Sequence, residues 1–130
     1  MTKQEHINYW SSQVDNDFKA SEVLCLAGYY AQSLFWAHLS LEKLLKAFWI
    51  KTNITNTPPF VHNLLRIALE TGFDFSEIEL EYFSEMNMFQ IKGRYPDYAE
   101  NIEEIVTKEI VEEYLYKSKN MILCIQEKLQ

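Results

Sequence analysis

Apolar residues recur along this chain at steps of three and four, the spacing that places them on one face of an α-helix. The first such pattern runs from about Glu5 to Ala27, and Gly28 is expected to end it. No segment shows the period of two that is typical of a strand. The stripe of the first pattern consists of Ile7, Trp10, Val14, Phe18, Ser21 and Cys25.

The second pattern, from about Tyr29 to Lys51, has a wider apolar arc than a surface helix needs. A helix with such an arc either lies at the centre of a bundle or packs against both its own core and a second subunit. The sequence leaves both alternatives open. The main stripe and the adjacent face consist of Tyr30, Leu34, Ala37, Leu41, Leu44, Leu45 and Phe48, and of Phe35, Leu39 and Trp49.

A loop and a short helix are expected next. The segment 52–60, TNITNTPPF, is rich in Thr, Asn and Pro and predicts a loop. Thr57 is expected to cap a helix that has Pro58 at its first position and runs from about Pro59 to Glu70, closed by Gly72.

Two further helices complete the pattern. Ser76 is expected to cap a helix that runs to about Gln90, and the last helix is expected from about Thr107 to Leu129. Together the segments predict an all-α, up-and-down four-helix bundle with an additional short helix. The length predicts a single domain over residues 1–130.

Composition and charge narrow the function classes. The chain carries 19 acidic and 12 basic residues, a net charge of −7, which disfavours RNA and anionic membranes as partners because both attract Lys and Arg. No segment has the roughly 18 apolar residues of a membrane span, and no signal peptide is recognised, so we expect a cytoplasmic protein. Cys25 and Cys124 are expected to be reduced, small buried hydrophobic residues.

Charged residues interrupt the apolar arc of the second helix. Glu42 and Lys46 lie four residues apart, which indicates either an ordinary surface ion pair or a partly covered pair that is held for a purpose. His38 falls beside the main stripe, where a buried histidine bonded to a side chain or carbonyl is favoured over a catalytic one.

His62 follows the two prolines and is expected to open the short helix, with Arg66 one turn later. A helix start offers free N–H groups to an anion, so His62 is a candidate site residue. The alternative is that His62 links the loop to the bundle. No spacing typical of a metal site is found, so neither a metal nor a cofactor is expected.

The segment 93–98, GRYPDY, interrupts the helical pattern. Pro96 disfavours a helical Tyr95, so Arg94 and Tyr95 are expected on a turn, with Lys92 nearby. An arginine held on a turn suits a phosphate or carboxylate, and tyrosine rings can stack on a base. The alternative is that Arg94 satisfies helix-end carbonyls or pairs with an acidic neighbour.

Several features, in this order, resemble the HEPN domain family (higher eukaryotes and prokaryotes nucleotide-binding domains), and the resemblance covers nearly the whole chain. Glu42 and Lys46 stand in the family's Glu-x-x-x-Lys-Ala positions. The quoted motifs are Gly28-Tyr29 at the end of the first helix, the run Ala37 to Trp49, the start His62-Asn63-Leu64, and the turn Arg94-Tyr95-Pro96.

This resemblance implies a bundle of four or five helices, usually a homodimer, often encoded beside a minimal nucleotidyltransferase in a toxin–antitoxin or nucleotide-handling module. Many members are metal-independent RNases in which an Arg is followed roughly four to six residues later by His. Here no histidine follows Arg94, because His62 is the last one in the chain.

The sequence therefore favours a binding module over an enzyme. We expect Arg94 and Lys46 to engage phosphates of a nucleotide while Glu42 orients Arg94, all in one cleft. An RNase or a helical dimer without ligand are the alternatives, and Arg94 and His62 are the only catalytic candidates. The expected ligand-binding residues are Arg94, Tyr95, Lys46, Glu42, His62 and Lys92.

Overall fold

The computed structural model describes residues 1–94 and 106–130, with side chains placed for residues 1–90 and 106–130. In this described part every regular element is a helix, which confirms the predicted all-α fold. None of the described helices is long and apolar enough to cross a bilayer. The helices are α1 (Lys3–Ser11), α2 (Val14–Leu26), α3 (Tyr30–Thr52), α4 (Leu64–Glu70), α5 (Glu77–Arg94) and α7 (Lys108–Leu129).

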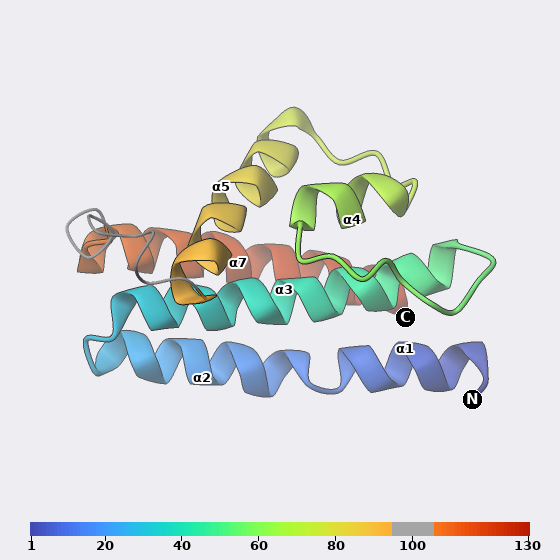
Figure 1. Cartoon of the computed structure of the whole chain (residues 1–130), viewed down its shortest axis with the longest axis horizontal. Coiled ribbons are helices and arrows are strands. Elements are labelled where there is room, and N and C mark those ends of the chain that lie inside the picture. Colours follow the sequence, from blue (N-terminus) through green and yellow to red (C-terminus); the bar gives the residue numbers. More distant parts are fainter. Residues whose placement is uncertain (95–105) are drawn as a thin grey trace.

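Helix α3 lies at the centre of the molecule. It packs against α1, α2, α4, α5 and α7, and Figure 1 shows α1 and α2 following one another along one side of it. This central position explains the wide apolar arc, since helices cover α3 on several sides. Its fully buried apolar residues are Leu34, Ala37, Leu41, Leu44, Leu45, Ala47 and Ile50.

The prediction of one continuous first helix was wrong, because α1 ends at Ser11 and α2 begins at Val14. The carbonyl of Tyr9 accepts hydrogen bonds from the Ser12 hydroxyl (3.3 Å) and from the Gln13 side-chain amide (3.1 Å). Such bonds from side chains to nearby carbonyls compete with the helical ladder. The predicted end at Gly28 is confirmed, with φ +85 at this glycine.

Two serines allow α2 and α3 to approach closely. The Ser21 hydroxyl donates to the Ser33 carbonyl (2.6 Å) and the Ser33 hydroxyl donates to the Ser21 carbonyl (2.7 Å). Both residues are completely buried. Ser21 therefore belongs to the buried stripe, as predicted, although it is polar.

The short helix α4 begins at Leu64, so the prediction of a start near Pro59 with a Thr57 cap was wrong. Asn63 is the cap, and its side-chain oxygen accepts from the Arg66 N–H (3.1 Å). Gly72 has φ +74 just after this helix, as expected of a glycine that ends it.

Helix α5 has the predicted cap, since Ser76 Oγ accepts from the Glu79 N–H (3.1 Å) and Glu79 Oε1 accepts from the Ser76 N–H (2.9 Å). The helix continues to Arg94, past the predicted end near Gln90. Gly93 keeps its backbone N–H and costs only about 1 kcal/mol inside a helix, so it does not end α5. Gly93 and Arg94 thus lie within α5, so the predicted turn does not begin there, and the rest of that prediction, residues 95–98, lies outside the described residues.

The predicted last helix, from about Thr107 to Leu129, is confirmed. Thr107 caps α7, with its hydroxyl accepting from the Ile110 N–H at 3.3 Å. Cys25 and Cys124 are free thiols, as expected, but both are half-buried where buried residues were predicted.

Candidate functional site

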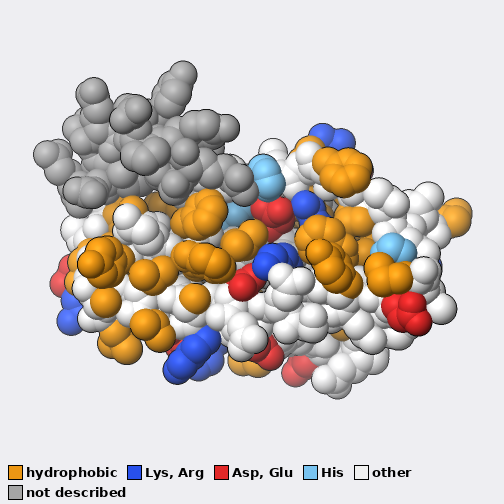
Figure 2. Space-filling model, turned by 60° about the horizontal axis from the view of Figure 1, so that its bottom comes forward, with side chains coloured by type: hydrophobic (Ala, Val, Ile, Leu, Met, Phe, Trp, Pro, Cys, Tyr) orange, Lys and Arg blue, Asp and Glu red, His pale blue; other side chains and the backbone are white. Residues whose placement is uncertain are grey.

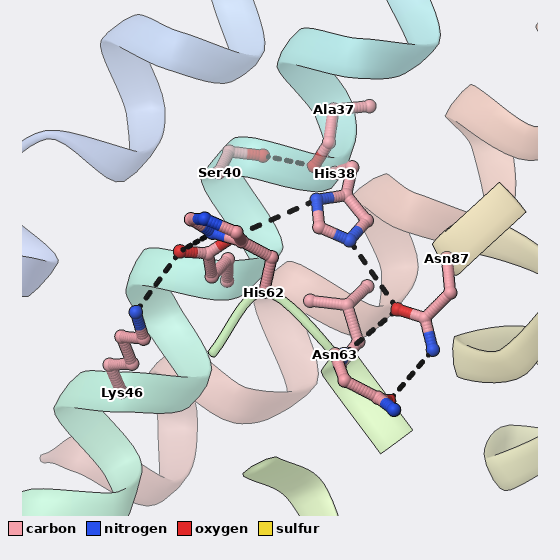
Figure 3. Close-up of polar contacts among 9 residues, drawn as sticks. Ala37, His38, Ser40, Lys46, His62, Asn63 and Asn87 are labelled. Carbon is pink, nitrogen blue, oxygen red and sulfur yellow. Dashed lines mark hydrogen bonds and ion pairs between the residues drawn. The ribbon is translucent and has the colours of Figure 1, made fainter. Parts of the chain in front are cut away.

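Glu42 is the centre of a polar cluster whose other members, His38, Lys46 and His62, are labelled in Figure 3. Its carboxylate accepts from the Lys46 ammonium at 3.1 Å and from Nδ1 of His62 at 3.0 and 3.1 Å. Glu42 is only 4% exposed and Lys46 only 5%. Of the two alternatives for this pair, the structure shows the covered one.

The cluster is assembled from two segments. Glu42 and Lys46 come from α3, one turn apart and on the same face, whereas His62 comes from the loop before α4. A buried ion pair gives little net stability, because both charges lose their hydration. The burial of the pair is therefore not explained by a net gain in stability alone.

His38 is a buried neutral histidine of the kind the sequence favours. It is 1% exposed, and burial lowers its pKa from 6.5 to about 4, against the opposing effect of the Glu42 carboxylate. Its Nε2 lies 3.4 Å from the Asn87 side-chain oxygen. That oxygen already accepts from the Leu64 N–H (2.8 Å), so His38 Nε2 is the donor.

Asn87 links three helices and was not predicted. Besides its contacts with His38 and Leu64, its side-chain amide donates to the Asn63 side-chain oxygen at 2.8 Å (Figure 3). The only sequence signal is an amide in the middle of a helix, a position that asparagine does not favour. That signal indicates that Asn87 is unusual, but it does not predict which residues Asn87 contacts.

The prediction that His62 opens the short helix was wrong, whereas its role as a site residue stays a prediction. His62 lies before the cap residue Asn63 and turns its imidazole toward Glu42. The N–H groups of Leu64 and Arg66 are already bonded to Asn87 and Asn63. The contact with Glu42 joins the loop before α4 to α3.

The Lys46 ammonium borders a second feature, an aromatic groove of about 240 Å³. The ammonium lies 5.1 Å from the centre of the Trp10 ring, which is a cation–π contact. Phe60, at the edge of this groove, is 93% exposed. Half of the described residues that line the groove are aromatic residues and prolines: Tyr9, Trp10, Pro58, Pro59 and Phe60.

Figure 2 shows how this chemistry reaches the surface. On the face drawn there, acidic, basic and histidine side chains gather between groups of hydrophobic side chains. His62 is the most accessible member of the Glu42 cluster, with 47% of its side chain exposed against 5% for Glu42. A ligand that approaches the cluster would therefore meet His62 and the aromatic groove first.

Three predicted site residues cannot be placed by their side chains. Those of Lys92 and Arg94 lie outside the described residues, as does the whole of Tyr95. The convergence of Arg94 with Glu42 and Lys46 stays a prediction. The described residues hold no group of His, Cys, Asp and Glu that could bind a metal ion.

Comparison with known proteins agrees with this picture. The HEPN domain family model matches residues 7–128, nearly the whole chain. No curated protein and no solved structure matched the chain. From the family match and the all-helical architecture it follows that the chain belongs to the HEPN domain family.

Proposed function

We propose that this protein is a HEPN-type binding module that holds the phosphates of a nucleotide at Lys46 and Arg94. One observation carries the proposal: the buried Lys46 ammonium, paired with Glu42 at 3.1 Å, borders an aromatic groove. A lysine in such a place is a fixed point charge for a phosphate oxygen.

The groove supports a nucleotide over a simple anion. Tyr9, Trp10 and Phe60 offer ring faces, and a base gains free energy by stacking on such rings. The net charge of −7 disfavours a long polyanion, because many phosphates would be repelled together. A mononucleotide needs only one or two cationic groups.

The register of α5 supports Arg94 as the second cation. Arg94 follows Asn87 by seven residues, two helical turns, and so shares its face of the helix. Asn87 faces the cluster, since it lies against His38 and Asn63. The backbone of Arg94 is thus about 10 Å beyond Asn87, toward the start of α3 and away from Lys46, so Arg94 would bind a different part of the nucleotide from Lys46.

Calorimetry with ATP tests the proposal. Lys46→Met and Arg94→Ala should each abolish measurable binding, because each removes a phosphate-binding charge, and Arg94→Ala should leave the melting temperature nearly unchanged. Lys119→Met is the matched control, because Lys119 is exposed on α7. This variant should bind ATP like the wild type. Wild-type protein that binds no nucleotide would refute the proposal, and unchanged binding with a large loss of stability would assign Arg94 a structural role.

A second candidate function is RNA cleavage, and the Glu42–His62 contact favours it. The carboxylate holds Nδ1 of His62 as the donor, which leaves Nε2 to exchange a proton. We expect any RNase activity to be insensitive to chelators and lost in His62→Ala. Intact RNA after incubation with the wild-type dimer would exclude this function.

We also propose a homodimer and a minimal nucleotidyltransferase as protein partner, in a toxin–antitoxin-like pair. The family membership supports both. Co-expression with a nucleotidyltransferase encoded beside this gene should give a complex that co-purifies. The remaining alternative, a helical dimer without ligand, would follow if ATP, RNA and nucleotidyltransferase all failed to bind.

A further inference from the structure

A groove of about 380 Å³ opens between α5 and α7. Both helices pack against α3, and Figure 1 shows α5 rising away from the line of α7. None of the residues lining this α5–α7 groove belongs to the Glu42 cluster or to the aromatic groove. It is therefore a separate feature that the proposed nucleotide site does not use.

The floor of the α5–α7 groove is apolar. Tyr82 and Met121 lie there and are 6% and 8% exposed, and half-buried Cys124 lies beside them. Ile78 stands at the rim with 80% of its surface in solvent. A large aliphatic side chain beside an apolar hollow marks a surface that a partner can cover.

Two hydrogen bonds fix the walls of the groove. The Tyr82 hydroxyl bonds to the Ser118 hydroxyl, and the Tyr114 hydroxyl donates to the Glu85 carboxylate. Each bond joins α5 to α7, so the spacing of the two helices is set before a partner arrives. A preformed groove reduces the entropy lost on binding.

The rim of the groove is negatively charged. Glu79, Glu81 and Glu85 line it from α5, and Lys117 lines it from α7. The Lys117 ammonium is already engaged, since it lies 3.1 Å from Glu113 and 5.2 Å from the centre of the Tyr114 ring. The carboxylates of α5 therefore determine the charge that an incoming partner meets.

We propose that the α5–α7 groove is a docking site for a basic amphipathic helix of a partner protein. Apolar residues on one face of that helix would fill the floor between Tyr82 and Met121 and cover Ile78. Lys or Arg residues flanking that face would pair with Glu79 and Glu81. This is recognition of an amphipathic helix in a groove, with charge selecting the partner.

The negative rim disfavours two other occupants of the groove, a second copy of this chain and an anionic surface. Two copies of this chain that met groove to groove would bring the α5 carboxylates of one against those of the other. Nucleic acid and anionic membrane surfaces are repelled by the same rim. A cationic helix is the occupant that both the floor and the rim favour.

The test uses a model peptide of about 18 residues, five helical turns, with leucine on one face and lysine on the others. Its controls are a glutamate-for-lysine version and a scrambled version of the same composition. In a Cys25→Ser background, alkylation of Cys124 by iodoacetamide reports coverage of the groove. The basic helix should slow this alkylation about fivefold or more, and neither control peptide should do so.

Variants locate the contact. Glu81→Lys and Ile78→Ser should each weaken binding of the basic peptide about fivefold, measured by fluorescence anisotropy. Both residues are exposed, so the fold should be retained. Glu109→Lys changes the net charge equally at an exposed position outside the groove and should bind like the wild type. Unprotected Cys124, or equal binding by all three variants and the wild type, would overturn the proposal.

Discussion

At the scale of single residues, His38 makes the stability of the fold depend on pH. Its pKa falls from 6.5 to about 4 because burial disfavours the charged ring. Between these values the unfolded chain binds a proton that the folded chain does not. The stability that neutral His38 contributes is therefore complete above pH 6.5 and is lost as the pH falls toward 4.

We expect this effect to reach about 3 kcal/mol of unfolding free energy across that range. Urea denaturation of the wild type and of His38→Gln, at several pH values from 4 to 7, measures it. Gln keeps a donor for Asn87 and does not titrate. The unfolding free energy of the variant should therefore fall less steeply than that of the wild type as the pH is lowered. Equal pH slopes for the two proteins would show that His38 is not the group responsible.

Glu42 and Lys46 should be strongly coupled. Glu42→Gln leaves the Lys46 ammonium buried without its counter-charge and should cost about 3 kcal/mol of unfolding free energy. The double variant Glu42→Gln/Lys46→Met should lose much less than the sum of the single changes. A double-mutant cycle by urea denaturation measures this coupling. Strict additivity would mean that the two side chains act independently.

The sequence placed Glu42, Lys46 and His62 among the candidates because charged and imidazole groups stand out against an apolar arc. The cap Asn63 was missed although asparagine is a preferred cap and its bond to the Arg66 N–H is local. Asn87 could not be identified, because its bonds to Leu64 and Asn63 span 23 and 24 residues of sequence and depend on where α5 lies against α4. Periodicity along one helix does not give that placement.

At the scale of helices, the serine pair controls how closely α2 and α3 approach. Ser21→Ala removes the hydroxyl that donates to the Ser33 carbonyl and should cost about 1 kcal/mol. Ser21→Val adds volume at a fully buried contact and should cost about 1–3 kcal/mol from overpacking alone. Chemical denaturation measures both. Ser84→Ala on exposed α5 surface is the control and should be neutral, and a neutral Ser21→Val would contradict close packing here.

Helix boundaries were predictable where a local signal decided them. Gly28 and Ser76 were assigned from residue type, and each carries out that role. The start of α4 was missed because Asn63 competes with Thr57 as a cap, and contact with Asn87 decides between them. The break between α1 and α2 was missed because Ser12 and Gln13 fit a helical pattern equally well.

At the scale of the whole molecule, α3 still exposes part of its apolar arc although five helices surround it. Trp36 and Leu39 are only half-buried, and they lie three positions apart, on one side of α3. The central position explains most of the arc, and this remaining strip is the part that a second subunit can cover. Exposure of such an apolar strip to water is unfavourable, and a homodimer interface would bury the strip.

We therefore predict that the wild type sediments at twice its chain mass of 15.5 kDa. Leu39→Glu should shift it to the monomer, because a carboxylate would face apolar surface across the interface. Leu123→Glu is the matched control, since Leu123 is 53% exposed on α7, and it should remain dimeric. Analytical ultracentrifugation separates these outcomes. If Leu39→Glu stays dimeric while Leu123→Glu becomes a monomer, the subunits meet through α7 and not through α3.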